Sequence, residues 1–134
     1  MTAPAGLLDT SVLIAAETGR TLGELPERVA ISVITLGELQ LGVLAASSAE
    51  DRARRADTLA LARSADPVPI TEATMDAWAR LVIDARSAGI HRTVKLSDAL
   101  IAATAIERGL PVVTQDDDFD QLARVHEPLD VIRV

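Results

Sequence analysis

Short apolar runs alternate along this chain with longer stretches in which apolar residues recur at helical spacing. The runs predict buried strands, because they are short and apolar at consecutive positions. They lie at residues 6–9, 29–33, 110–114 and 131–134. The longer stretches predict helices at residues 12–16, 38–46, 49–63, 72–87 and 98–108. Strands that alternate with helices in this way are typical of an α/β fold.

The pattern predicts more about the arrangement of these elements. Strands that are apolar on both faces favour a mainly parallel central sheet with helices on both sides, a three-layer α/β/α domain. The helix over residues 98–108 is apolar almost all round, which places it at the centre of the fold. Pro67 and Pro69 indicate that residues 67–70 form a short extended piece at a sheet edge or at the start of a strand. Without repeats or linkers, the chain is expected to form a single domain over residues 1–134.

Hydroxyl residues stand where several of the predicted helices begin. Thr10 and Ser11 are expected to cap the first helix, Thr71 the helix over residues 72–87, and Ser97 the helix over residues 98–108.

Composition restricts the chemistry that the chain can perform. It has 134 residues without Cys, which excludes disulfides, thiolate zinc sites and Cys nucleophiles. Its two His residues, His91 and His126, lie far apart and are expected to be ordinary surface residues. One Trp and one Phe are too few for a broad base-stacking platform. Neither a targeting signal nor a membrane span is visible, so a cytoplasmic location is expected.

Acidic residues are therefore the main supply of reactive groups. Asp9 and Asp116 follow predicted strands, while Asp98 and Glu38 lie near the starts of predicted helices. In parallel sheets, ligands bind beyond the carboxyl ends of the strands. Carboxylates gathered there repel one another unless a cation compensates, and oxygen ligands suit Mg²⁺ or Mn²⁺.

Each of these acids also has an ordinary structural explanation. Asp9 suits a helix N-cap, Asp98 complements a helix dipole, and Glu38 suits a solvated helix position. The run from Asp116 to Asp120 suits a solvated acidic loop. Only the order and context of the acids together favour a catalytic cluster.

Four segments of the chain resemble, in order, the motifs of the PIN-domain ribonucleases. They are LLDTSVLI at residues 7–14, ISVITLGEL at 31–39, LSDALIAATA at 96–105 and VVTQDDDF at 112–119. Within that family the chain looks most like a VapC-type toxin of a toxin–antitoxin pair. The resemblance runs from Gly6 to Val134 and implies a PIN-like fold.

The resemblance also implies roles for individual residues. Asp9, Asp98 and Asp116 would coordinate Mg²⁺, or alternatively Mn²⁺, and Glu38 would complete the catalytic acidic cluster. Weaker expectations, given as supporting positions, fall on Asp118, Thr114, Thr10 and Ser11.

The implied substrate is RNA, cut by metal-activated water to leave a 5′-phosphate and a 3′-hydroxyl. Cleavage of tRNA, rRNA or mRNA would arrest translation. Arg92 and Lys95 are candidates for contacts with RNA phosphates, whereas Arg52, Arg54 and Arg55 suit a solvated helix face better. The family further implies a VapB-type antitoxin as partner, docking on the helices at residues 38–46 and 49–63, and a homodimer.

Other functions remain open at this stage. A degenerate PIN domain would bind RNA without cutting it. A haloacid-dehalogenase-like enzyme requires an Asp where Ser11 stands, and a receiver-like signalling domain requires a Lys after a late strand, whereas the only Lys is Lys95.

Overall fold

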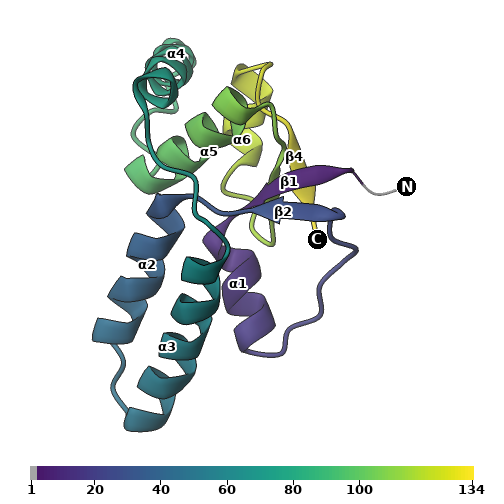
Figure 1. Cartoon of the computed structure of the whole chain (residues 1–134). Coiled ribbons are helices and arrows are strands. Elements are labelled where there is room, and N and C mark those ends of the chain that lie inside the picture. The colour runs from purple at the N-terminus through teal and green to yellow at the C-terminus, as the bar shows by residue number, and fades with distance from the viewer. Residues whose placement is uncertain (1–2) are drawn as a thin grey trace.

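The computed structural model describes residues 3–134, so Met1 and Thr2 of the predicted domain lie outside the described residues. Its strands are β1 (Ala5–Leu8), β2 (Arg28–Ala30), β3 (Val112–Thr114) and β4 (Val131–Arg133). Its helices are α1 (Thr10–Glu17), α2 (Val33–Leu44), α3 (Ala49–Ser64), α4 (Glu72–Ser87), α5 (Leu96–Arg108) and α6 (Asp120–Val125) (Figure 1).

The strands form a sheet in the order β2-β1-β3-β4, and every pairing is parallel. This confirms the predicted parallel sheet. The central pair is β1 and β3, in which Leu7 is opposite Val112 and Leu8 is opposite Val113. Val68 of the predicted extended piece forms an isolated parallel bridge with Ser32, beyond the end of β2. The carboxyl ends of β1 and β3 therefore lie side by side.

Two hydrophobic cores lie on opposite faces of this sheet. Leu7 and Val112 point into a core shared with α4, α5 and α6. Leu8 and Val113, the next residue along each strand, point into a core shared with α1, α2 and α3. Successive side chains of a strand face opposite sides, so each central strand supplies both cores. This arrangement confirms the predicted three-layer α/β/α architecture.

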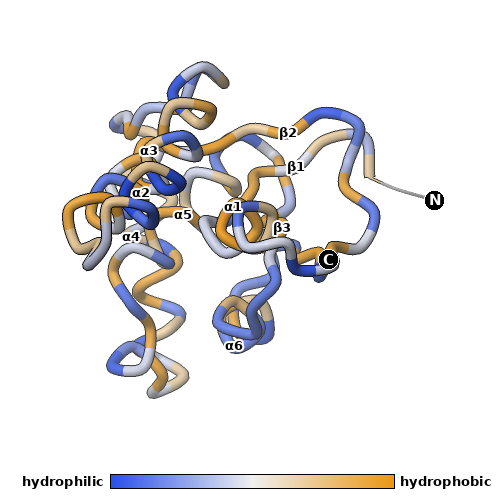
Figure 2. Tube along the Cα trace, turned by 90° about the horizontal axis from the view of Figure 1, so that it is seen from below, coloured by the Kyte–Doolittle hydropathy of each residue, from blue (hydrophilic) through white to orange (hydrophobic). Residues whose placement is uncertain are grey.

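Helix α5 occupies the centre of the larger core, as its composition predicts. Ile101, Ala102, Ala103 and Ala105 are all fully buried. Figure 2 shows hydrophobic positions along α1, β1 and α5 toward the middle of the molecule, and hydrophilic ones on α6 and the outer loops. Within residues 3–134, no helix is both long and apolar enough to cross a membrane.

The edge strands depart from the prediction of strands buried on both faces. Val29 in β2 is 47% exposed, and the residues of β4 are at best half-buried. Both strands have a neighbour on one side only, so fewer helices cover them.

Several predicted helix boundaries are wrong. Helix α2 begins at Val33, five residues before Glu38, because Ser32 caps it by accepting a hydrogen bond from the Thr35 N–H. The strand predicted over residues 29–33 from its β-branched residues is also too long, because β2 ends at Ala30 and Val33 already belongs to α2. The predicted N-cap Thr71 does cap α4, whereas α5 begins at Leu96 after Lys95, so Ser97 is not its cap.

Helix α6 is missing from the predicted elements. Its anchors are Phe119 and Leu122, which are both fully buried and three residues apart. That spacing is a helical signal, but the acidic run just before it favours a loop.

Gly6 is required by the close approach of β1 to its neighbours. A Cβ atom at this position would stand 2.5 Å from Val113 Cγ2 and 3.1 Å from Pro26 Cγ. Gly37, in contrast, lies in α2 with nothing within 4 Å of the corresponding position. The two glycines form a matched pair for testing the central sheet.

We expect Gly6→Ala to destabilise the protein by about 1–3 kcal/mol, because the added methyl group overpacks the sheet. Gly37→Ala should stabilise it by up to about 1 kcal/mol, since Ala is the better helix former. Urea denaturation followed by circular dichroism measures both changes. Equal effects of the two substitutions would contradict the packing described here.

Candidate active site

A cleft at the carboxyl ends of β1 and β3 collects acidic side chains from separate elements. Asp9 follows β1, Glu38 lies in α2, Asp98 lies near the start of α5, and Asp116 and Asp118 follow β3. The cleft is lined by these five acids together with Thr10, Ser11, Ile14, Arg20 and Lys95. The structure thus brings together all the acids that the motifs single out.

Asp9 is the most buried of the five acids that line the cleft. Its backbone N–H donates to the Val113 carbonyl oxygen at 2.8 Å, which continues the β1–β3 pairing. Only 5% of the residue is exposed. Its Oδ2 accepts a hydrogen bond from the fully buried Thr114 hydroxyl at 3.0 Å. Because both ends of Asp9 are anchored to β3, its carboxylate has little freedom to move.

Thr114 also organises the loop that follows β3. Its Oγ1 accepts a hydrogen bond from the Asp116 N–H at 3.0 Å and lies 3.2 Å from Ser11 Oγ. Ser11 Oγ in turn accepts from the Gln115 N–H at 3.0 Å. These bonds tie the start of α1 to the segment that carries Asp116.

Glu38 is positioned from α1 in a similar way. The Thr10 hydroxyl donates to Glu38 Oε1 at 2.7 Å and lies 3.1 Å from the Thr35 hydroxyl. Thr10 is therefore the first residue of α1 rather than its cap, and the cap position belongs to Asp9, whose side chain makes no capping bond. The expectation that Thr10 and Ser11 cap this helix is wrong.

The chain is similar in sequence to a known protein family over most of its length. A family model described as PIN domain matches residues 6–125. The chain belongs to the PIN-domain family. Ribonuclease VapC8 of Mycobacterium tuberculosis (strain H37Rv) is 65% identical to it over 100 residues, covering 75% of this chain and 89% of that protein. Ribonuclease VapC5 of the same strain is 48% identical over 123 residues, covering 90% of each.

A solved structure matches this PIN domain over nearly its whole length. It is the crystal structure of VapBC-5 from Mycobacterium tuberculosis, a member of the VapBC family of toxin–antitoxin systems. The match has a TM-score of 0.88 at 42% identity and covers 98% of this chain and 99% of that chain. The predicted PIN fold is thereby confirmed, and the receiver-like and dehalogenase-like alternatives are not favoured.

Burial and neighbouring charges raise the pKa of two of the acids in the cleft, Asp98 and Asp116. Burial, followed by the charges of Asp9 and Asp118, raises the pKa of Asp98 to about 6, although Lys95 opposes the shift. Burial, again followed by Asp9 and Asp118, raises the pKa of Asp116, while Arg20 acts in the opposite direction. Raised pKa values of this origin mark carboxylates whose negative charge lacks compensation.

The donor atoms of the cleft can be compared with those that divalent cations prefer. The donors are carboxylate oxygens, which Mg²⁺ and Mn²⁺ prefer, and Lys95 and Arg20 are the cations lining the cleft. Within residues 3–134, however, no three Asp, Glu or His side chains form a cluster ready to hold a metal ion. Carboxylates in one cleft repel and stay apart unless a cation draws them together. The donor set fits a divalent cation in its chemistry, and metal ligation stays a prediction.

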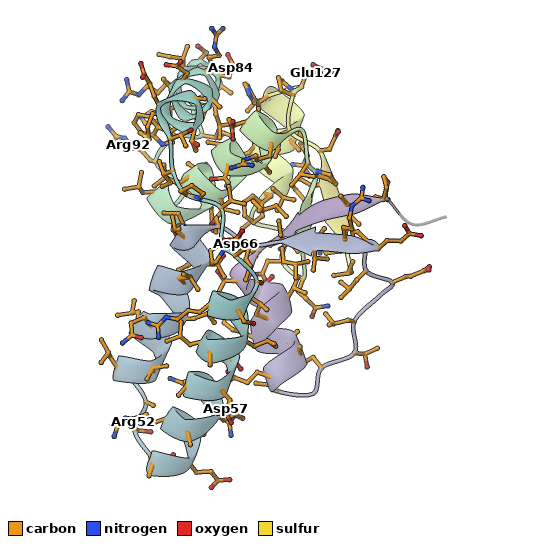
Figure 3. All side chains as sticks on the ribbon, in the orientation of Figure 1. Arg52, Asp57, Asp66, Asp84, Arg92 and Glu127 are labelled. Carbon is orange, nitrogen blue, oxygen red and sulfur yellow. The ribbon has the colours of Figure 1, made fainter. Side chains whose placement is uncertain are left out.

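The predicted RNA-contacting residues differ in their positions. Lys95 is exposed and lines the cleft beside Asp98. Arg92 is also exposed, but it lies in the loop between α4 and α5 outside the lining of the cleft (Figure 3).

The arginines of α3 have structural partners. Arg55 Nη1 donates to the Gly42 carbonyl oxygen at 2.7 Å, and Arg52 Nη2 donates to the Ala46 carbonyl oxygen at 3.3 Å. Arg54 forms ion pairs with Asp51 at 2.7 Å and with Glu17 at 3.8 Å. These side chains tie α3 to α2 and α1, and the interpretation of the cluster as structural is favoured.

His126 is not a surface residue, contrary to expectation. Only 5% of it is exposed, and its Nδ1 lies 2.7 Å from Asp84 Oδ2. The single Asp–His pair joins α4 to the end of α6, so its role is to pack these elements. His91 is exposed, as expected.

Two residues at or next to the cleft, Thr35 and Arg20, were not predicted from the sequence motifs. Thr35 lies one helical turn before Glu38, and this spacing was a signal that could have linked the two. Arg20 lines the cleft directly after Gly19, where φ is +75°, and the sequence pattern did not single it out as a site residue.

The pKa of Asp98 predicts how stability depends on pH. It rises from 3.8 to about 6 on folding, so the folded state holds the proton more tightly than the unfolded state. In the presence of a chelator, stability should fall as pH rises from about 4 to about 6. Asp98→Asn removes this loss and should stabilise the protein at pH 7 by about 1 kcal/mol, once solvent screening of the half-exposed group is allowed for.

Thermal unfolding of both chains between pH 4 and pH 8 measures this effect. The melting temperatures of the two chains should be similar near pH 4, separate as the pH rises to about 6, and stay apart by a constant amount above that. A gap that stays constant over the whole range would show that Asp98 is not the titrating group.

Proposed function

We propose that this PIN domain is a metal-dependent endoribonuclease and the toxin of a type II toxin–antitoxin system. The observation that carries the proposal is the convergence of Asp9, Glu38, Asp98 and Asp116 from separate elements on one cleft. The names of its relatives, Ribonuclease VapC8 and Ribonuclease VapC5, support the activity, and RNA is accordingly the proposed substrate. A cytoplasmic location follows from this role.

In this proposal Asp9, Asp98 and Asp116 hold Mg²⁺ or Mn²⁺, with Glu38 completing the cluster. A bound divalent cation supplies a Lewis acid that stabilises charge on the scissile phosphate and lowers the pKa of water. Thr114 fixes the Asp9 carboxylate, and Thr10 fixes Glu38 through its 2.7 Å hydrogen bond. Both hydroxyls thereby reduce the reorganisation that the acidic cluster needs when the substrate arrives.

Lys95 and Arg92 would position the RNA in this mechanism. Lys95 stands on the rim of the cleft, where its ammonium group can meet a phosphate next to the scissile one. Arg92 lies farther along the same loop and suits a contact with a more distant phosphate. Such contacts fix the strand without selecting its sequence.

A VapB-type antitoxin is the proposed protein partner, and a homodimer the proposed assembly. The similar VapBC-5 structure is that of a member of the VapBC family of toxin–antitoxin systems, which supports this proposal. In this chain, α2 and α3 expose Leu41, Leu44 and Leu61, each about two-thirds exposed or more. A groove between α1, α2 and α3 is lined by Glu38, Leu39 and Gly42, and it adjoins the acidic cleft because Glu38 lines both. A peptide on this surface would reach the cleft and block it.

Asp9→Asn and Asp98→Asn should each lower RNA cleavage by more than about 100-fold, since each removes a charged oxygen ligand. Cleavage of total cellular RNA in Mg²⁺, followed by sequencing of fragment ends, measures the loss and names the target. The matched control is Asp57→Asn, an exposed residue of α3 (Figure 3) that does not line the cleft, and this variant should cleave like the parent chain.

Two outcomes would count against this proposal in different ways. If the folded, Mg²⁺-loaded parent chain cuts no RNA, the proposed endoribonuclease activity is wrong. RNA binding without cleavage is then the remaining alternative. If the parent chain cuts and Asp9→Asn cuts equally well, the assignment of the site is wrong.

The docking surface is tested by Leu44→Ser, which removes a 70% exposed apolar side chain from α2. We expect it to weaken binding of the antitoxin encoded beside the toxin gene by about tenfold. The control is Ile83→Ser on α4, which is 56% exposed and lies outside the α2–α3 surface. Titration calorimetry measures both affinities. Loss of affinity in the control alone would move the docking surface to α4.

A further inference from the structure

A second pocket lies beside the acidic cleft and contains none of its acids. It is formed by α4, α5 and the loop between them, and its lining includes Trp78, Val82, Arg86, His91, Val94 and Leu96. Below, this set is called the Trp78 pocket. Its floor is apolar, and Trp78 is the only tryptophan of the chain. Neither the metal site nor the proposed antitoxin surface uses it.

The surroundings of the Trp78 pocket are basic. Residues 85–97 contain no Asp or Glu, but they contain Arg86, His91, Arg92 and Lys95. Arg86 and His91 line the pocket, and Arg92 extends into solvent from the same loop. Among residues 3–134, none of these four side chains takes part in an ion pair. On a chain with a net charge of −7, this segment offers a polyanion a favourable approach.

One turn of α5 lines both the pocket and the cleft. Lys95 and Asp98 face the acidic cleft, whereas Leu96 and Ala99 face the Trp78 pocket. Consecutive residues of a helix point about 100° apart, so the two hollows lie on neighbouring faces of the same turn. A strand with a phosphate in the cleft can therefore place an adjoining nucleotide in the pocket.

The indole of Trp78 carries an unused hydrogen-bonding group. Within the described part of the chain its Nε1 is buried and has no hydrogen-bond partner. Packing alone therefore sets the orientation of the ring, which is one of the side chains that line the pocket. Nucleobases have a flat apolar face that suits stacking on an aromatic side chain.

We propose that the Trp78 pocket binds one base of the RNA next to the cleaved bond and selects the cleavage sequence. The inference rests on the proposed ribonuclease function and adds a specificity site to it. The base packs against the indole, while Arg86 and His91 contact the flanking phosphates. Leu96, which is 64% exposed, lies between pocket and cleft and is covered by the bound strand.

The single tryptophan makes this proposal directly measurable. RNA tetranucleotides of each single base are titrated into the Asp9→Asn chain, which binds without cutting, and the emission of Trp78 is followed. A base in the pocket should quench the emission, with affinities that differ by about fivefold or more between the bases. Anisotropy of labelled tetranucleotides reports binding independently of the tryptophan.

Two arginines of α4 provide a matched comparison. Arg86 lines the Trp78 pocket, while Arg80 is exposed on the same helix and lines a different hollow beside Asp84. Arg86→Ala should weaken the binding detected by quenching about fivefold, and Arg80→Ala should leave it unchanged. Val82→Phe fills the pocket and should remove the difference between bases, with urea denaturation confirming that this variant folds.

Three results would overturn the proposal. The first is RNA binding, seen by anisotropy, with no change in Trp78 emission. The second is an emission change on dilution without RNA, which would assign the pocket to a contact between two copies of the chain. The third is an equal effect of Arg80→Ala and Arg86→Ala.

Cleavage assays separate this inference from the function on which it rests. Val82→Phe in the active chain should shift the preferred cleavage sites while total cleavage of RNA persists. Cleavage at unchanged sites would contradict the proposal that the pocket selects a base, while the proposed ribonuclease function would remain supported. Base-selective quenching in a parent chain that never cuts overturns the ribonuclease and leaves the pocket as an RNA-binding site.

Discussion

The hydrogen bond from the Thr114 hydroxyl to the Asp9 carboxylate is the contact on which the site depends. It joins the ends of the two central strands at 3.0 Å and is buried within the fold. Because Thr114 also accepts from the Asp116 N–H, one hydroxyl sets the positions of two of the four motif acids. The Thr10 hydroxyl of α1 similarly fixes the position of Glu38 in α2, because it donates a hydrogen bond to the Glu38 carboxylate. Neutral hydroxyl groups thus hold like charges in one cleft without adding charge of their own.

This arrangement changes the meaning of the overall charge. A net charge of −7 argues against a polyanionic partner if it is spread over the surface. Removing the four motif acids from the 20 acidic residues leaves 16 against 13 basic residues, a net charge of −3. Part of the acidity is therefore concentrated in the cleft, and the acid-free segment over residues 85–97 adjoins it through Lys95. The distribution of charge, rather than its sum, decides which molecules can approach.

The sequence predicts the strands, the parallel sheet and the buried helix α5, since these follow from apolar runs and periodicity. It also predicts which acids share the cleft, because strand ends and helix starts meet at one edge of a parallel sheet. It does not predict the start of α2, because the β-branched residues that favour a strand over 29–33 extend to Val33, where the helix already begins. The burial of His126 against Asp84 and the approach of Arg20 to the cleft depend on contacts distant in sequence, which local patterns do not encode.

The Thr114–Asp9 bond joins residues that lie 105 positions apart, and this separation sets the order in which the site can form. Asp9 precedes α1, whereas Thr114, Asp116 and Asp118 come only after α5. A partly folded chain in which β3 has not paired with β1 therefore contains Asp9 and Glu38 but nothing that holds them near Asp116. The acidic cleft is a product of the completed sheet, and any change that weakens the β1–β3 pairing also removes the cleft.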